Sequence, residues 1–189
     1  MRLIQSLNSR SWSLCWSVAI ASLSIAMSSQ AVRFPDGTVA FESGISLVDA
    51  HTTFSGVRVR QARYYFDLEL PPDLGEPLSK IVIKQRSGGD EVKFKPDKTK
   101  AYLGNHNDKQ EPLEVTTRID EATAEVIVRF EKPIPPGKAV TIGIKPRQNP
   151  DYAGVYLFGV TAFPVGDKPT GMYLGPGRFH FYRSGDFYY

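Results

Sequence analysis

Apolar and polar residues alternate along many short segments of this chain, and the alternation predicts β-strands. In segment 62–70, the apolar residues Tyr64, Phe66, Leu68 and Leu70 occupy every second position. This period of two is typical of a strand with one buried face. Comparable segments follow at 80–84, 92–95, 113–119, 125–131, 138–145 and 178–182, separated by glycine, proline and polar turns. No segment after residue 31 has the periodicity of an amphipathic helix.

Segment 154–166 is the longest uncharged apolar and aromatic run outside the N-terminus. It is too short to span a bilayer as a helix, and it is rich in Val, Phe, Tyr and Thr, which suit a pleated surface. We therefore expect a buried strand at the centre of a sheet. Gly159 in its interior predicts a bulge or the close approach of a neighbouring backbone or bulky side chain.

Eight or nine short strands separated by turns predict an all-β protein, an immunoglobulin-like or Greek-key β-sandwich. The rigid segment 133–137 (Pro-Ile-Pro-Pro-Gly) resembles the corner between the two sheets of such a sandwich. Gly88-Gly89 predicts a hairpin turn, after which 92–95 pairs back. We expect polar or glycine-rich connections at 49–53 and 166–177, and a long surface loop at 97–112 with a short strand at 101–103.

The N-terminal segment 1–31 has the features of a secretory signal peptide. Arg2 and Arg10 precede an uncharged apolar stretch at 14–27, and small residues at Ser29 and Ala31 suit a signal peptidase. We expect cleavage after Ala31, leaving one β-sandwich domain at 32–189. An uncleaved anchor is the alternative, although the apolar stretch is shorter than the ~20 residues that a spanning helix needs.

Composition narrows the chemistry of the mature chain. Cys15 is the only cysteine and lies inside the signal segment, so we expect no disulfide, thiol or blue-copper chemistry. Removing Arg2 and Arg10 lowers the formal charge from +3 to +1. A nearly neutral chain without a basic patch does not favour nucleic-acid binding, and we expect no membrane-spanning segment after cleavage.

Histidines and carboxylates are the candidate functional side chains. His51, His106 and His180 are far apart in sequence, and we expect the first two in loops and His180 facing outward beside Phe179 and Phe181. They could form a metal site only by converging in space. We therefore predict no catalytic, cofactor-binding or metal-ligating residue.

Carboxylates offer two further alternatives. Asp67 and Glu69 share one face of a strand and, with Asp151, could serve a glycan hydrolase. The alternation predicts that this face is solvated, which disfavours the raised pKa that a catalytic acid needs. Segment 105–108 (Asn-His-Asn-Asp), with Asp97 upstream, offers oxygen ligands for calcium, but three nearby lysines oppose a cation.

Aromatic residues gather near the C-terminus. Phe179 and Phe181 are expected in the core, whereas Phe187, Tyr188 and Tyr189 could contact a partner, because aromatic side chains supply large contact areas.

Five segments resemble a cyanobacterial family of exported proteins known only as domain of unknown function family 2808. They are 47–54, 64–71, 133–143, 154–164 and 175–182. The resemblance covers nearly all of the mature chain and implies one exported domain in a periplasmic, lumenal or extracellular setting. It implies no activity and no functional residue.

A sheet pattern without a catalytic constellation favours a non-enzymatic exported module without a cofactor. We expect it to bind an envelope protein or a polysaccharide. A carboxylate-based glycan hydrolase and a weak metal-binding protein are the alternatives.

Overall fold

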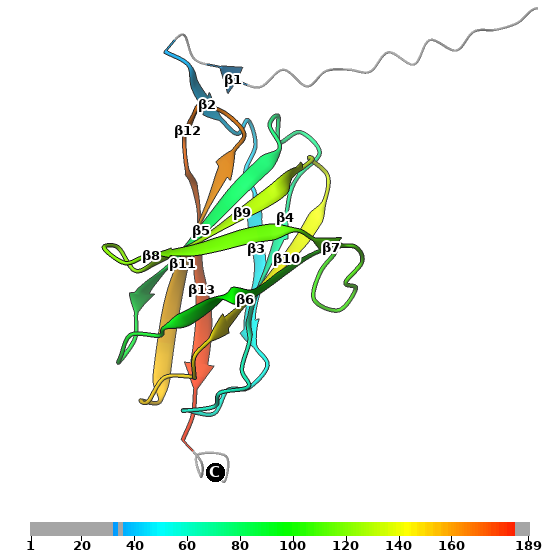
Figure 1. Cartoon of the computed structure of the whole chain (residues 1–189). Helices are drawn as coiled ribbons and strands as arrows, with labels where there is room; N and C mark the ends of the chain where they lie inside the picture. Colours follow the sequence, from blue (N-terminus) through cyan, green and yellow to red (C-terminus); the bar gives the residue numbers. More distant parts are fainter. Residues whose placement is uncertain (1–31, 34–35, 184–189) are drawn as a thin grey trace, which may run out of the picture.

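The computed structural model of the protein describes residues 32–33 and 36–183, and every regular element in these ranges is a β-strand (Figure 1). No helix in this part of the chain is long and apolar enough to cross a membrane. The strands are β1 (Val32–Arg33), β2 (Thr38–Ala40), β3 (Ser46–Thr52), β4 (Tyr64–Glu69), β5 (Leu78–Ser87), β6 (Phe94–Leu103), β7 (Pro112–Leu113), β8 (Val115–Asp120), β9 (Glu125–Ile134), β10 (Ala139–Pro146), β11 (Gly154–Pro164), β12 (Lys168–Pro169) and β13 (Met172–Phe181).

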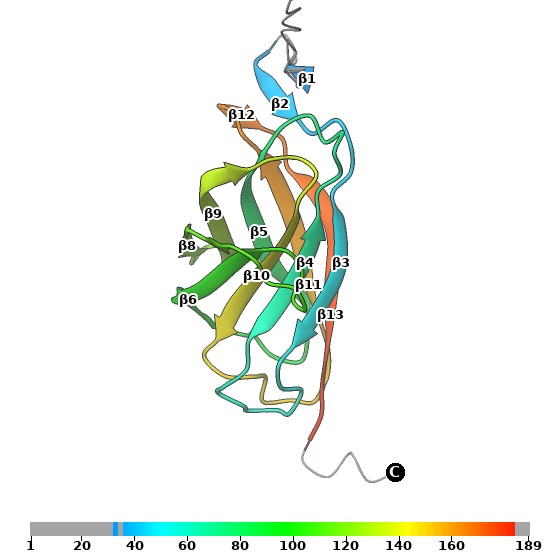
Figure 2. The same ribbon diagram turned by 90° about the vertical axis from the view of Figure 1, so that its right-hand side faces the viewer.

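Two five-stranded sheets form the body of the protein (Figure 2). The first sheet has the order β3-β4-β10-β6-β7, and the second has the order β13-β11-β5-β9-β8. Strands β3-β4-β10-β6 facing β13-β11-β5 reproduce the strand order of an immunoglobulin domain, with β8 and β9 added as an extra hairpin. The predicted immunoglobulin-like β-sandwich is therefore confirmed. A small third sheet, β1-β2-β12, lies beyond one end.

Aromatic side chains fill the space between the two sheets. The alternating residues of β4 point inward, as predicted, and Phe179 and Phe181 of β13 join them in the core. The Tyr64 hydroxyl donates a 3.0 Å hydrogen bond to Oδ1 of the buried Asn149. Buried aromatic rings therefore join the two sheets: Tyr64, Phe66, Phe94, Tyr156, Phe158, Phe179 and Phe181.

Strand β11 matches the predicted apolar strand, but it is not the centre of its sheet. It pairs with β13 and β5, and β5 occupies the central position. Gly159 is buried, and a Cβ atom there would lie 2.9 Å from Arg86 Nε and 3.1 Å from Tyr173 Cε2. The close approach predicted at this glycine is confirmed.

The hairpin predicted at Gly88-Gly89 is wrong, because the chain crosses from β5 in the second sheet to β6 in the first. Strand β6 also continues past Pro96, where the pairing with β10 shifts in register. The predicted loop at 97–112 is consequently shortened to 104–111. The corner predicted at 133–137 is confirmed, and the strands predicted at 113–119 and 125–131 pair as a hairpin, β8 with β9.

Two predicted connections are also strands. Residues 49–52 belong to β3, whose polar side chains line the outer face of the first sheet. Strand β13 begins at Met172 and pairs with β11 on both sides of Gly175, with a register shift between Val160 and Thr161. The C-terminal residues Phe187, Tyr188 and Tyr189 lie outside the described residues, as does the predicted signal peptide.

Candidate metal centre

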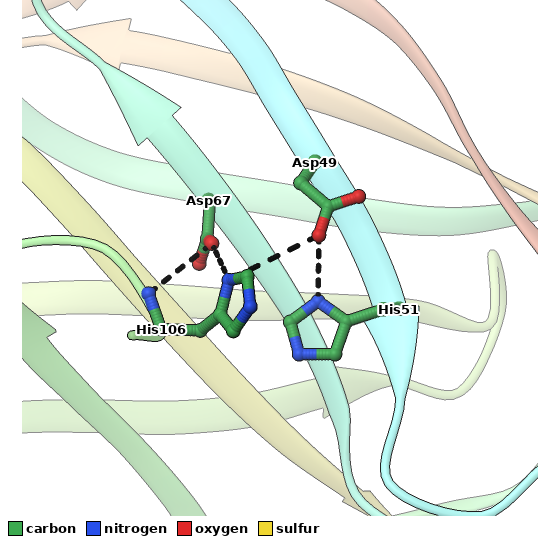
Figure 3. Close-up of side chains that lie close together, drawn as sticks. All are labelled: Asp49, His51, Asp67 and His106. Carbon is green, nitrogen blue, oxygen red and sulfur yellow. Dashed lines mark hydrogen bonds and ion pairs between the residues drawn. The ribbon is translucent and has the colours of Figure 1, made fainter. Parts of the chain in front are cut away.

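Four potential metal ligands meet on the outer face of the first sheet (Figure 3). Asp49 and His51 lie two residues apart on β3 and so point to the same side. Asp67 of β4 lies directly opposite Asp49 in the antiparallel register. His106 comes from loop 104–111. One ligand atom from each residue lies within 4.8 Å of all the others.

Loop 104–111 is folded so that His106 returns over the sheet. Its ends are joined by two backbone hydrogen bonds, one from Leu103 to Glu111 at 2.8 Å and one from Gln110 to Leu103 at 2.9 Å. Inside the loop, Asn105 Oδ1 accepts hydrogen bonds from the backbone amides of Asn107 and Asp108, at 3.0 and 2.9 Å. Such a side-chain turn fixes the direction of the residue that follows the asparagine.

Gly104 begins this loop with a φ of 88°, which favours glycine. A Cβ atom at this position would lie 2.0 Å from the carbonyl oxygen of Asp108. The amide of Gly104 donates a 2.8 Å hydrogen bond to Ala139 of β10, which anchors the loop to the sheet. The tight turn that presents His106 therefore depends on a glycine at 104.

The ring nitrogens of the two histidines face the carboxylates (Figure 3). His106 Nδ1 lies 2.5 Å from Asp67 Oδ2 and 3.9 Å from Asp49 Oδ2. His51 Nδ1 lies 2.9 Å from the same Asp49 oxygen. The two imidazole rings are 4.1 Å apart between centroids. The four polar groups therefore surround one small volume.

Asp67 is the buried member of the cluster, and its side chain is only 5% exposed. Its Oδ2 accepts a 3.2 Å hydrogen bond from the backbone amide of His106. Its Oδ1 lies 2.8 Å from the hydroxyl of Thr141, which also lies 2.9 Å from the carbonyl oxygen of Gly104. A buried carboxylate is stable only with such partners, and groups of this kind orient metal ligands.

The cluster is open to solvent on its other side. The side chain of Asp49 is 47% exposed, and those of His51 and His106 are each 30% exposed. Tyr65 stacks on the ring of His51 at 5.2 Å, and Lys109 Nζ lies 4.2 Å from the centroid of the Tyr65 ring. An ion can therefore reach the four ligands from water without rearrangement of the core.

The donor set suits a divalent transition metal. Imidazole and carboxylate together are typical ligands of zinc, iron, nickel and copper, whereas calcium and magnesium prefer oxygen alone. Four ligands about 2.1 Å from a tetrahedral zinc ion are about 3.4 Å from one another. The observed donor atoms, within 4.8 Å of one another, need to move by roughly an ångström to reach this geometry.

Several sequence-based predictions fail at this site. Asp67 was expected on a solvated face, but loop 104–111 covers it. His51 was expected in a loop and lies on β3, whereas His106 is in a loop as predicted. His180 faces outward on β13, as predicted, and takes no part in the cluster. The structure therefore joins two of the three histidines.

The remaining candidates lie elsewhere or are occupied. Glu69 is exposed, and Asp151 pairs with Arg58 at 3.1 Å. The calcium ligands that the sequence disfavoured do not come together, because Asn105 accepts hydrogen bonds from backbone amides and Asp97 pairs with Lys98 at 3.3 Å. Asp151, Asn105 and Asp97 therefore already have structural partners, and Glu69 lies outside the cluster.

Asp49 is the candidate ligand that was not singled out from the sequence alone. The sequence does contain one indication of its role: Asp49 and His51 are two residues apart, and an Asp-x-His pair on a strand presents both side chains to the same face. The prediction of a connection at 49–53 concealed this spacing. His106 could not be assigned to the same site, because nothing local to the sequence places loop 104–111 over β4.

Three solved structures resemble this chain at low identity. The collagen-binding subdomain of the Enterococcus faecalis surface protein ACE is 8% identical, with a TM-score of 0.46, covering 74% of this chain and 99% of that chain. The collagen-binding domain from a Staphylococcus aureus adhesin is 11% identical, with a TM-score of 0.36, covering 72% and 99%. A cohesin module from a Clostridium perfringens family 33 glycoside hydrolase is 11% identical, with a TM-score of 0.34, covering 72% and 98%.

No curated protein matches the chain. The sequence does match a protein family, described as "Protein of unknown function (DUF2808)", over residues 38–181. The match spans all the strands of both main sheets, including the three strand and loop segments that supply the candidate ligands. The chain therefore belongs to the DUF2808 family.

Proposed function

We propose that this protein is an exported, non-enzymatic β-sandwich that binds a divalent transition-metal ion through Asp49, His51, Asp67 and His106. The observation that carries the proposal is the convergence of two imidazoles and two carboxylates from β3, β4 and loop 104–111. Zinc is the first candidate, because it accepts both donor types and imposes no geometry through its d-electrons.

The support comes from the arrangement of the cluster as well as its composition. The buried carboxylate of Asp67 is held by Thr141 and by the amide of His106. Metal-ligating carboxylates usually have hydrogen-bonding partners of this kind. The alternative role for the same residues is a hydrogen-bonded network that fastens loop 104–111 to the sheet. In that network each histidine nitrogen that faces a carboxylate carries a proton, and a bound metal ion would displace this proton.

Metal titration of the mature chain separates these two roles. Residues 32–189 are expressed, stripped with a chelator and titrated with zinc by calorimetry, beside the His106→Ala and Asp67→Asn variants. We expect one zinc ion per chain and a loss of affinity of at least about 100-fold in each variant. His180→Ala removes an imidazole outside the cluster and is the matched control. Absence of zinc binding, or equal loss in the control, would contradict the proposal.

Export is the second part of the proposal, and it is supported by the sequence of 1–31. The expected setting is the cell envelope or the extracellular space, where the domain would also contact a protein or polysaccharide partner. Expression of the full chain in a bacterial host and mass spectrometry of the secreted fraction test this. A new N-terminus close to Val32 supports export, whereas an intact cytoplasmic chain contradicts it.

A further inference from the structure

The outer face of the second sheet carries a concentration of positive charge. It is the face opposite to the metal cluster, and the outward positions of four strands contribute six basic side chains. These are Lys80, Lys84 and Arg86 of β5, Arg118 of β8, Arg129 of β9 and Arg178 of β13. The mature chain has a formal charge of only +1 by sequence, so charge is distributed unevenly over its surface, with an excess of cations on this face.

Three of these cations crowd together without a carboxylate partner. Lys80 lies directly opposite Arg129, and Arg118 lies diagonally across from Arg129 in the β8–β9 register. None of the three forms an ion pair with an acid among residues 36–183. Partial burial, and then the charges of Arg129 and Arg118, lower the pKa of Lys80. Like charges opposite one another destabilise a sheet.

Three acids on this face, Asp120, Glu125 and Glu131, offset only part of the charge of the six basic side chains. Glu125 pairs with Lys84 at 3.2 Å, and Asp120 accepts hydrogen bonds from two turn amides at 3.0 and 3.2 Å. Glu131 accepts a hydrogen bond from the hydroxyl of Thr116. With six cations against these three carboxylates, an incoming anion would therefore meet a net positive field, which is strongest at Lys80, Arg118 and Arg129 because none of them has an acidic ion-pair partner among residues 36–183.

Aromatic rings support two of the basic side chains. Lys80 Nζ lies 4.1 Å from the centroid of the Phe163 ring, and the Arg86 guanidinium lies 5.9 Å from that of Tyr173. Between the cations, Val82 and Ile127 are half-buried and stand opposite each other across the two strands. Val82 and Ile127 are thus the apolar side chains within the row Lys80, Arg129 and Arg118, whereas the exposed Tyr173 lies at the far end of the face beside Arg86.

We propose that this face binds an anionic polysaccharide. The row Lys80, Arg129 and Arg118 crosses three adjacent strands that are about 4.8 Å apart, so its charges suit closely spaced anionic groups along a linear polymer. A membrane surface fits less well, because binding to it normally includes insertion of apolar side chains. The proposal is independent of the metal site, which lies on the other sheet.

Binding to defined polymers tests the proposal. Mature protein is titrated at about 0.1 M salt with dextran sulfate, polygalacturonate and neutral dextran, with and without zinc. We expect binding to at least one of the two anionic polymers, no binding to dextran, the same affinity with and without zinc, and weakening as salt rises. The double variant Arg118→Ser/Arg129→Ser should bind at least about tenfold more weakly.

Arg60→Ser/Arg147→Ser is the matched control, because it also removes two exposed arginines, outside the second sheet. Thermal unfolding of both double variants verifies that each is folded, and Lys80→Gln provides a second variant of the same row. The proposal is overturned if the wild type binds neither anionic polymer or if the control loses as much affinity. Tighter binding to duplex DNA or to anionic vesicles than to both polymers would assign the face to a different partner and also overturn it.

Discussion

The two outer faces of this sandwich contrast in charge and in cover. On the first sheet, carboxylates and imidazoles gather beneath loop 104–111, and Asp67 becomes buried. On the second sheet, basic side chains spread over a face that no long loop of the described residues covers in the same way, and Arg118 and Arg129 stay exposed. Both faces arise from the same alternation of inward apolar and outward polar residues. The contrast teaches that alternation fixes which residues face outward, whereas the connecting loops decide which of them stay exposed.

The largest expected effect is on the first face. Zinc at about 100 times its Kd should stabilise the native state by about 2.7 kcal/mol, because only the folded chain brings the four ligands together. For a domain of this size the midpoint of thermal unfolding should rise by roughly 5–10 °C. Calorimetric unfolding with zinc and with a chelator measures the shift. Asp67→Asn should show little or none of it, and an equal shift in that variant would contradict the assignment.

Gly104→Ala should have the next largest effect, a loss of zinc affinity. The added methyl group would meet the carbonyl oxygen of Asp108, and the positive φ adds a cost of about 1–2 kcal/mol. We expect displacement of His106 and a zinc affinity lower by about tenfold or more. Gly175→Ala is the matched control, because Gly175 has a φ of 103° with nothing within 4 Å of a Cβ atom. It should lower stability and leave zinc binding unchanged.

Thr141→Val tests the support of Asp67 with a smaller change. The substitution preserves shape and removes the hydroxyl that lies 2.8 Å from Asp67 Oδ1. Zinc affinity should fall by roughly tenfold, because outer partners orient the ligand carboxylate. Thr161→Val makes the same substitution on β11 of the second sheet and should leave the affinity unchanged. Identical titration curves for wild type and Thr141→Val would show that the hydroxyl does not position Asp67.

Arg129→Thr should have the smallest effect and the opposite sign. Removing one of the crowded cations relieves its repulsion with Lys80 across the strands, so the free energy of unfolding should rise by about 0.5 kcal/mol. Denaturant unfolding at low salt measures this gain, and added salt should reduce it. A loss of stability at low salt would show that Arg129 makes a favourable contact that outweighs the repulsion.

The general fold could be predicted because it follows from local patterns. Alternation at 62–70 and 138–145 identified β4 and β10, and the proline-rich corner identified the passage between sheets. The errors fall where local and long-range preferences compete. Gly88-Gly89 favours a hairpin, yet β5 obtains both of its partners from distant segments, β9 and β11.

The candidate metal site could be predicted only in part, for a related reason. Asp49 and His51 are brought together by a single strand, but their pairing opposite Asp67 depends on a register between β3 and β4 that contains a shift. His106 reaches the site through Gly104 and the turn at Asn105. Polar residues on a strand predict exposure, and Asp67 is buried because a distant loop covers it.

The central claim is that Asp49, His51, Asp67 and His106 together hold one transition-metal ion. Anomalous diffraction at the zinc edge, from crystals of residues 32–189 grown with equimolar zinc, tests it most directly. The account predicts one strong peak at about 2.0–2.2 Å from ligand atoms of these residues. A peak only at His180 or at lattice contacts, or no peak with the four side chains ordered as hydrogen-bonded pairs, would contradict it.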